Sequence, residues 1–440
     1  MHNDSTGLPP EFADRFTEPF ARFLKIEAAA GGMLLIATVT ALILSNSAWS
    51  TPFLAFWEIP IGLHFGSLDF TRSLRHWIND GLMTLFFFVV ALELKRALVL
   101  GELRDLRAAA LPFSGALGGM LIPVCVYVLL MWGQPGMHGW GTVMATDTAF
   151  VIGCLALLGS RIPPTLRLFF LSLAIFDDVG AIAVVAISYS DALNWVPLSL
   201  AVLGLSAVAG FARLGIRSVP FYFLLGGVIW LCFDASGIHA TITGVILGLM
   251  TPTHGWVSDE RLRAVLSRAL SHPTGDFWSG DTTERRDLLR AGTALTETLS
   301  PVERLEIMLH PWVGFMVMPI FALANAGVEI HGADLGQPVS AAIFAGLAFG
   351  KPIGVLTFSW LAVRLGIASR ALGLSWRLLA AGSLLTGIGF TMSLFIADLA
   401  YDPAVLNAAK IGILAASTVS AAAGLMMLLW LTHVKRIGFV

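Results

Sequence analysis

The fold is decided by residues 166–187, which read LRLFFLSLAIFDDVGAIAVVAI. This stretch is long and apolar enough to cross a bilayer, yet two adjacent carboxylates, Asp177 and Asp178, interrupt it. Ionisable groups at membrane depth are energetically costly, so their presence indicates a functional site. Asp147 lies inside the preceding apolar segment, and Lys351 lies inside a later one. Three carboxylates and one amine at membrane depth predict a pathway for cations or protons.

The composition is typical of a polytopic helical membrane protein. Hydrophobic residues make up 56% of the chain and charged residues 13%, and apolar runs of about twenty residues recur along it. We therefore expect an all-α integral membrane protein with about twelve transmembrane helices. No nucleic-acid partner and no cofactor are indicated. The cysteines have no metal-ligand spacing and are expected to be core residues: Cys125, Cys154 and Cys232. The predicted spans are residues 27–46, 76–99, 108–132, 141–159, 166–188, 195–213, 219–234, 237–252, 310–328, 339–363, 377–400 and 405–431.

The distribution of basic residues predicts the orientation of these spans. With both termini in the cytoplasm, 23 of the 27 Lys and Arg side chains fall on the cytoplasmic side. Residues 1–26 then form a cytoplasmic tail, whose helically spaced phenylalanines favour either an interfacial helix or packing against the bundle. Residues 27–440 form one twelve-span domain, with an extracytoplasmic loop or hairpin at 51–75 and a cytoplasmic loop at 254–308.

The charged groups inside the membrane share one depth. Asp147 lies 13 residues before Ser160, and Asp177 lies 13 residues after Pro164. Lys351 lies 13 residues before Arg364. At about 1.5 Å per residue, each charged group is roughly 20 Å from the cytoplasmic end of its helix, near the middle of the bilayer. The sequence therefore predicts one site at mid-membrane.

Two predicted spans also carry signs of an interrupted helix at that depth. Span four contains Ala145-Thr146-Asp147-Thr148, and span eleven contains Thr386-Gly387-Ile388-Gly389-Phe390-Thr391. The backbone groups of an interrupted helix must line a polar cavity, although close helix packing is an alternative reason for Gly387 and Gly389. If both helices are interrupted, spans three to five and ten to twelve are inverted repeats whose discontinuous helices, spans four and eleven, cross at the centre.

Several motifs along nearly the whole chain closely resemble those of the NhaA-type sodium/proton antiporters. The resemblance implies a bacterial inner-membrane protein, not an enzyme, that expels Na⁺ or Li⁺ electrogenically using inward proton flow. It also implies a fold with crossed, broken helices. The motifs occur in the order of the family: Ala145-Thr146-Asp147, Ala174-Ile175-Phe176-Asp177-Asp178-Val179-Gly180-Ala181, Ser236-Gly237-Ile238-His239-Ala240-Thr241, Leu309-His310-Pro311-Trp312, Phe349-Gly350-Lys351-Pro352 and Gly387-Ile388-Gly389-Phe390-Thr391-Met392-Ser393.

The resemblance also implies roles for the membrane-embedded residues. Asp178 matches the principal ion-binding carboxylate of the family, and Asp177 matches its neighbour. Thr146 and Asp147 match the polar break, so Na⁺ ligands are expected from Asp178, Asp177 and Thr146. Na⁺ and H⁺ would compete for these carboxylates during alternating access. Lys351 matches the family's membrane lysine and is expected to pair with Asp177, where it either carries a proton or serves as a counter-charge.

Regulation by pH is implied for three further positions. Glu93 and Glu306 match a regulatory cluster at the cytoplasmic mouth, and His239 matches a histidine near the periplasmic side. An interfacial charge is the alternative for Glu93, and a helix cap is the alternative for His239. The chain departs from the family pattern at Ala97, Glu303 and Ile307, and in a longer connection at 254–300. Because of these departures, we expect the pH profile of transport to differ from that of the family.

A homodimer is expected through residues 56–72, which contain short strand-like runs where the family forms a pairing hairpin. Two other classes of protein share part of this pattern. An intramembrane aspartyl protease also uses two aspartates that share a proton, but it would not require Lys351 or two broken helices. A sodium-coupled symporter would need additional polar residues for an organic substrate, and the sequence shows none.

Overall fold

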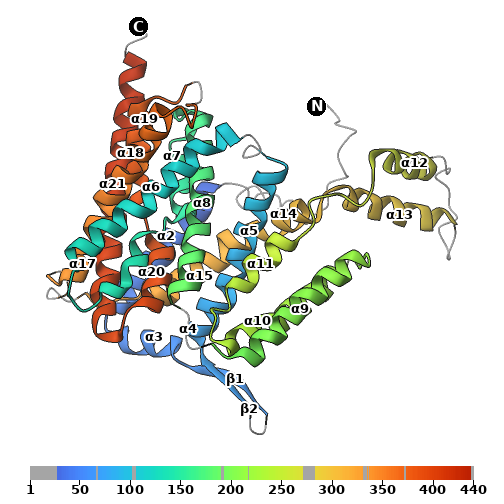
Figure 1. Ribbon diagram of the computed structural model, residues 1–440, viewed down its shortest axis with the longest axis horizontal. Helices are drawn as coiled ribbons and strands as arrows, with labels where there is room; N and C mark the ends of the chain where they lie inside the picture. Colours follow the sequence, from blue (N-terminus) through green and yellow to red (C-terminus); the bar gives the residue numbers. More distant parts are fainter. Residues whose placement is uncertain are drawn as a thin grey trace.

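The chain is almost entirely helical (Figure 1). The computed structural model describes residues 27–65, 68–101, 106–189, 193–216, 218–270, 283–330, 334, 336–370 and 373–437. The predicted N-terminal tail, residues 1–26, lies outside the described residues. The helical prediction is confirmed, because the described elements include only two strands besides the helices.

The spans observed in the described ranges are fewer than the twelve predicted. Eight helices are long and apolar enough to cross a membrane, and the bent pair Trp376–Gly387 and Phe390–Ala400 adds a ninth. The other three predicted spans contain shorter helices, namely Ala29–Ser45 within the first, the 17-residue α5 (Met83–Val99) and the nine-residue α11 (Ile242–Met250). The chain is nevertheless a multi-pass membrane protein by its apolar helices.

Long helices and short helical segments alternate along much of the chain. In the first half these are α2 (Glu27–Ser45), α3 (Ser50–Trp57), α4 (Leu74–His76), η1 (Trp77–Leu82), α5 (Met83–Val99), α6 (Leu106–Leu130), η3 (Met137–Val143), α7 (Thr148–Leu157), η4 (Gly159–Arg161), α8 (Pro164–Ser188), α9 (Trp195–Arg213) and α10 (Val219–Ser236). In the second half they are α11 (Ile242–Met250), α12 (Asp259–Leu270), α13 (Thr283–Thr298), α14 (Pro301–Trp312), η5 (Val313–Val317), α15 (Met318–Asn325), α17 (Pro338–Ala345), η6 (Gly346–Gly350), α18 (Lys351–Arg364), α19 (Trp376–Ser383), η7 (Leu384–Gly387), α20 (Phe390–Ala400) and α21 (Pro403–Ile437).

A single β-hairpin projects from one end of the molecule, at the bottom of Figure 1. Strand β1 (Pro60–Phe65) pairs antiparallel with β2 (Leu68–Ser73), so that Pro60 lies opposite Ser73 and Gly62 opposite Thr71. The strand-like runs predicted in this segment therefore do form strands. We call this end of the molecule the hairpin side.

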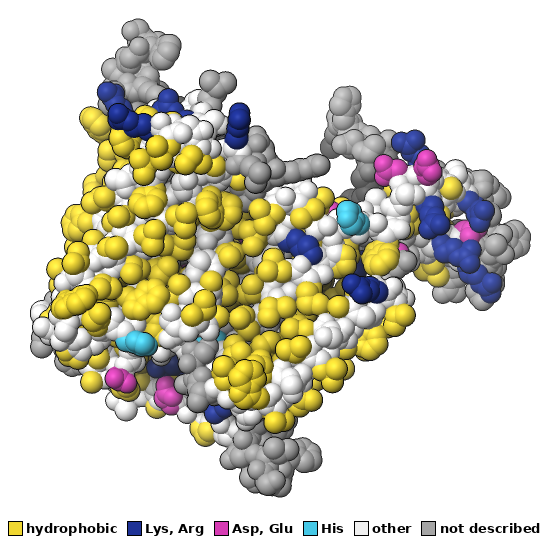
Figure 2. Space-filling model, viewed as in Figure 1, with side chains coloured by type: hydrophobic (Ala, Val, Ile, Leu, Met, Phe, Trp, Pro, Cys, Tyr) yellow, Lys and Arg dark blue, Asp and Glu magenta, His cyan; other side chains and the backbone are white. Residues whose placement is uncertain are grey.

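The helices α6, α8, α18, α20 and α21 lie together in a compact bundle (Figure 1). The helices α9 and α10 diverge from this bundle, and α12 and α13 extend from the end of the molecule away from the hairpin. The lateral surface of the bundle is a broad hydrophobic band, and basic side chains gather at the edge away from the hairpin (Figure 2). Exposed large apolar side chains, such as Ile187 with 83% exposure, have the lipid-facing character of a membrane span.

Two local predictions differ from the structure. The span expected from residue 310 begins at Pro301, because Ser300 and Glu303 form a capping box: each side chain accepts the other residue's backbone N–H. This helix begins inside the segment predicted as the cytoplasmic loop 254–308, which also contains α12 and α13. The core prediction for the cysteines is wrong for Cys125, which is exposed on α6, because one face of a membrane helix points to lipid.

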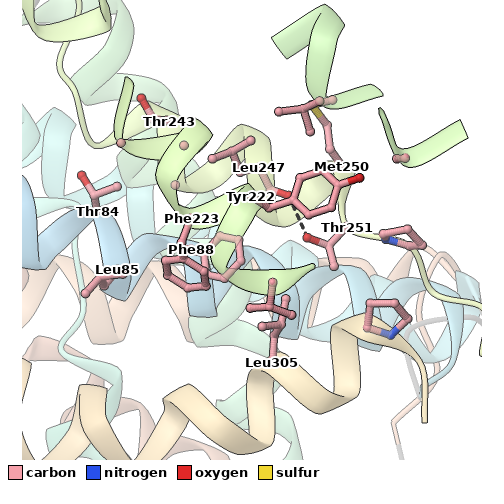
Figure 3. Close-up of a pocket in the computed structure, with 18 of the residues that line it drawn as sticks. Thr84, Leu85, Phe88, Tyr222, Phe223, Thr243, Leu247, Met250, Thr251 and Leu305 are labelled. Carbon is pink, nitrogen blue, oxygen red and sulfur yellow. Dashed lines mark hydrogen bonds between the residues drawn. The ribbon is translucent and has the colours of Figure 1, made fainter. Parts of the chain in front are cut away.

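An apolar cavity of about 340 Å³ lies between α5, α9, α10, α11 and α14. Figure 3 shows Phe88 and Phe223 on one wall, with Leu247 and Leu305 beside them. None of the membrane-embedded residues predicted to bind ions lines this cavity. It is therefore separate from the polar centre described next.

Candidate ion-binding site

Two interrupted helices meet at the centre of the bundle. Residues 145–147 are non-helical between η3 and α7, and Ile388 is extended between η7 and α20. The second interruption bends the helix pair by 41°. The backbone N–H of Asp147 donates to the carbonyl oxygen of Ile388 at 2.7 Å, so the two interruptions satisfy each other's free backbone groups.

Close packing also applies to the first glycine of the second interruption. A Cβ atom on Gly387 would lie 2.6 Å from the carbonyl oxygen of Leu347, a backbone atom of another segment. A Cβ atom on Gly389 would lie 2.2 Å from Ser393 Oγ, which belongs to a side chain of the helix that Gly389 precedes. Close packing between segments therefore accounts for Gly387 more directly than for Gly389.

Asp147 caps two helices with one carboxylate. Its Oδ1 accepts the N–H of Phe150 at 3.0 Å, at the start of α7. Its Oδ2 accepts the N–H of Thr391 at 3.0 Å and the Thr391 hydroxyl at 2.5 Å, at the start of α20. The carboxylate is fully buried, and its negative charge faces the positive ends of two helix dipoles. Both oxygens of Asp147 are therefore engaged in holding the interrupted helices together.

Lys351 and Asp177 form a buried ion pair beside this junction. Lys351 Nζ lies 2.7 Å from Asp177 Oδ2, and both side chains are fully buried. The Thr146 hydroxyl donates to the same oxygen at 2.5 Å, and Lys351 also donates to the carbonyl oxygen of Met144. That carbonyl lies just beyond the C-terminal end of η3, where a cation is favoured. The ammonium thus offsets both a carboxylate and a helix end.

Asp178 is the carboxylate with the fewest protein partners in this cluster. Its Oδ2 accepts the hydroxyl of Thr148 at 3.0 Å. Its Oδ1, and the Oδ1 of Asp177, are buried and have no hydrogen-bond partner among the described residues. A buried acceptor without a partner is energetically costly unless a ligand satisfies it. Two such carboxylate oxygens on consecutive residues are suited to a hard cation or a proton.

The residues predicted to regulate activity form contacts of their own, although Glu93 also acts electrostatically on Asp178. Glu306 on α14 forms a salt bridge with Arg96, in which Glu306 Oε2 lies 2.8 Å from Arg96 Nε. Glu93 Oε1 lies 3.6 Å from His310 Nε2. Both glutamates therefore belong to one charged contact between α5 and α14. His239 Nε2 lies 2.6 Å from the carbonyl oxygen of Tyr189, the C-cap residue of α8. Because a carbonyl can only accept, the imidazole donates and caps this helix.

Known proteins resemble this chain over almost its whole length. The sequence profile of the family described as "Na+/H+ antiporter 1" matches residues 21–428. The chain belongs to this Na⁺/H⁺ antiporter family. A relative from Rhizobium meliloti (strain 1021), named "Na(+)/H(+) antiporter NhaA", is 61% identical over 99% of this chain and 100% of its own length. Another from Acidiphilium cryptum (strain JF-5), named "Na(+)/H(+) antiporter NhaA 2", is 62% identical over 96% of this chain and 94% of its own length. The family consists of transporters and not of enzymes.

One polar network in this antiporter family member was not predicted from sequence. Lys410 Nζ lies 2.7 Å from Asp398 Oδ1, and Asn79 donates to Asp398 Oδ2 at 3.2 Å. Asn325 in turn donates to Asn79 Oδ1 at 2.7 Å. The network joins α21, α20, η1 and α15. The partners of Lys410 come from segments that are remote in the sequence, so no local pattern indicates the network.

Proposed function

We propose that the chain exchanges Na⁺ or Li⁺ for H⁺ across the bacterial inner membrane, with Asp178 as the principal ion-binding group. The observation that carries this proposal is the pair of buried Oδ1 atoms on Asp177 and Asp178, which lack partners among the described residues. A carboxylate that binds either Na⁺ or a proton makes one site serve both ions by competition. The family relationship supports Na⁺ and H⁺ as the transported ions.

Ligands for Na⁺ are available from three side chains of the site. Asp178 and Asp177 each offer one oxygen, and Thr146 offers a hydroxyl oxygen next to Asp177. Within the described residues, the Lys351 ammonium pairs with Asp177 alone, so a bound cation or proton would neutralise the negative charge of Asp178. Proton carriage by Lys351 and a purely counter-charging role both agree with this geometry. An exchange of more than one proton for each Na⁺ makes the transport electrogenic.

Alternating access would take place between two inverted repeats. The first consists of α6, the interrupted pair η3 and α7, and α8. The second consists of α17 to α18, the interrupted pair η7 and α20, and α21. The interrupted helices, spans four and eleven, would cross where Asp147 contacts Ile388 and Thr391. Transporters with such repeats place their binding sites at broken helices near mid-membrane.

The orientation and assembly are proposed from charge and from the hairpin. The bias of Lys and Arg puts both termini and α12–α13 in the cytoplasm and the hairpin side in the periplasm. Two copies would pair through residues 56–72, which contain β1 and β2. Glu93 and Glu306 would then lie toward the cytoplasm and regulate activity by pH, while His239 would lie toward the periplasm.

A transport assay with one pair of variants tests the ion-binding proposal. Addition of Na⁺ to proteoliposomes with a preformed pH gradient should collapse the gradient for the wild type. Asp178→Asn should reduce this response to background, because the amide keeps the shape but cannot carry charge or cycle a proton. Asp147→Asn should retain exchange with apparent Na⁺ affinity weakened about tenfold, the factor for about 1.4 kcal/mol, since it disturbs only the helix junction.

The same preparations contain the control for this assay. Unchanged elution in size-exclusion chromatography would show that Asp178→Asn still folds. Turnover at the wild-type rate by folded Asp178→Asn would contradict the central assignment.

A further inference from the structure

Three side chains with metal-binding atoms converge on the hairpin side, away from the ion-binding site. His76 ends α4, Asp80 lies one turn later in η1, and Asp234 lies in the last turn of α10. One ligand atom from each residue lies within 4.8 Å of the other two. No other group of three His, Cys, Asp or Glu ligands with this spacing occurs in the described part of the chain.

The distances agree with a small ion at the centre of the three atoms. His76 Nε2 is 3.1 Å from Asp80 Oδ2 and 4.0 Å from Asp234 Oδ1. Nitrogen and oxygen ligands lie about 2.1 Å from Zn²⁺, so two ligands of a tetrahedral ion are about 3.4 Å apart. The measured separations lie on both sides of this value. A small rotation of the carboxylates would complete three sites of a tetrahedron, with water at the fourth.

The neighbouring groups leave His76 Nε2 and Asp234 Oδ1 available to bind an ion. His76 Nε2 is buried and makes no hydrogen bond within the described residues, although it lies close to both carboxylates. The second oxygen of Asp234, Oδ2, lies 3.6 Å from the Arg72 guanidinium, which leaves Oδ1 on the side of His76. An outer contact of this kind orients a metal-binding carboxylate. Arg72 can therefore support the site through Oδ2 while Oδ1 binds an ion.

We propose that His76, Asp80 and Asp234 form a site for Zn²⁺ or a chemically similar transition-metal ion. One imidazole and two carboxylates are a ligand set typical of such ions, whereas Mg²⁺ and Ca²⁺ prefer oxygen ligands alone. A bound ion would join η1 to the end of α10, two elements that the chain connects only through α5 and the intervening helices. The site is independent of the proposed Na⁺ exchange.

Titration calorimetry of the tag-free full-length protein in detergent tests this proposal. The wild type should bind one Zn²⁺ per chain, and bound Zn²⁺ should raise its melting temperature because the ion joins two elements of the folded state. His76→Ala and Asp234→Asn should each weaken this binding by about tenfold or more. Mg²⁺ at the same concentration should produce neither heat nor stabilisation.

A matched control removes another histidine. His254→Ala deletes an exposed imidazole between α11 and α12 and should bind Zn²⁺ as the wild type does. Asp234→Asn keeps the shape of the side chain and decides the matter if His76→Ala does not fold. Equal Zn²⁺ affinity in the wild type and in folded Asp234→Asn would overturn the proposal, and would identify the cluster as an ion-pair network only.

Discussion

At the scale of the residue, the buried pair of Lys351 and Asp177 should have a large effect on the free energy of unfolding. The Lys351 ammonium is fully buried, and removal of either member of the Lys351–Asp177 pair leaves an uncompensated charge. We expect Lys351→Gln and Asp177→Asn each to destabilise the protein by about 3–5 kcal/mol. The double variant removes both charges together and should recover most of this loss. Thermal unfolding of the four proteins in one detergent measures the recovery.

Transport by the same four proteins separates the two roles open to Lys351. If the ammonium is only a counter-charge, the double variant should still exchange Na⁺ at Asp178, with fewer protons moved per ion and therefore a smaller current. If Lys351 carries the proton, the double variant should be stable but inactive, or active without current. A double variant with wild-type current and no recovery of stability would show that the two residues are not functional partners.

The sequence predicted residue positions better than residue contacts. Counting along apolar spans placed Asp147, Asp177 and Lys351 at one depth, and the structure brings all three to the junction of the interrupted helices. Counting could not show that both oxygens of Asp147 cap helices, because that depends on the direction of the broken backbone. The Asp398–Lys410 pair was missed for a related reason, since single polar residues near helix ends leave no periodic pattern.

At the scale of the element, α5 and α14 meet through charged side chains. Glu306 faces Arg96, Glu93 and His310, and Glu303 of the same helix is engaged in its capping box. Neutralising Glu93 or Glu306 should move the pH of half-maximal exchange by about one unit, because it changes the charge beside the remaining titratable groups; a shift of one unit corresponds to about 1.4 kcal/mol. Activity at alkaline pH should change much less, because the ion-binding residues are untouched. Exchange measured across a pH series provides the test.

The control for this prediction is a substitution at a neighbouring uncharged residue. Ile307→Ala changes an exposed apolar side chain beside Glu306 and should keep the wild-type pH profile. If both glutamate variants also keep that profile, the pH dependence arises at the ion-binding site alone.

Element boundaries were predictable where the sequence carries a local signal. The interrupted helices were predicted from threonine, aspartate and glycine. The two strands were predicted from short strand-like runs, and their hairpin from the family resemblance. The start of α14 also has a local signal, Ser300 followed three residues later by Glu303, which apolarity alone overlooks. By contrast, the π-helical segments η1, η5 and η6 were not predicted from the sequence.

At the scale of the whole molecule, the hairpin projects from the bundle as an isolated pair of strands. An isolated pair of strands is marginally stable in water, and β1 and β2 form such a pair beyond the end of the bundle (Figure 1). Pairing with the hairpin of a second copy would extend the sheet and stabilise both. Replacing residues 60–73 by a short Gly-Ser linker should therefore convert a dimer into a monomer in light scattering. Asp178→Asn, with its hairpin intact, should remain dimeric, and the linker variant should still exchange ions, because every residue of the proposed ion-binding site comes from one chain. A linker variant that stays dimeric would place the contact between copies elsewhere on the surface.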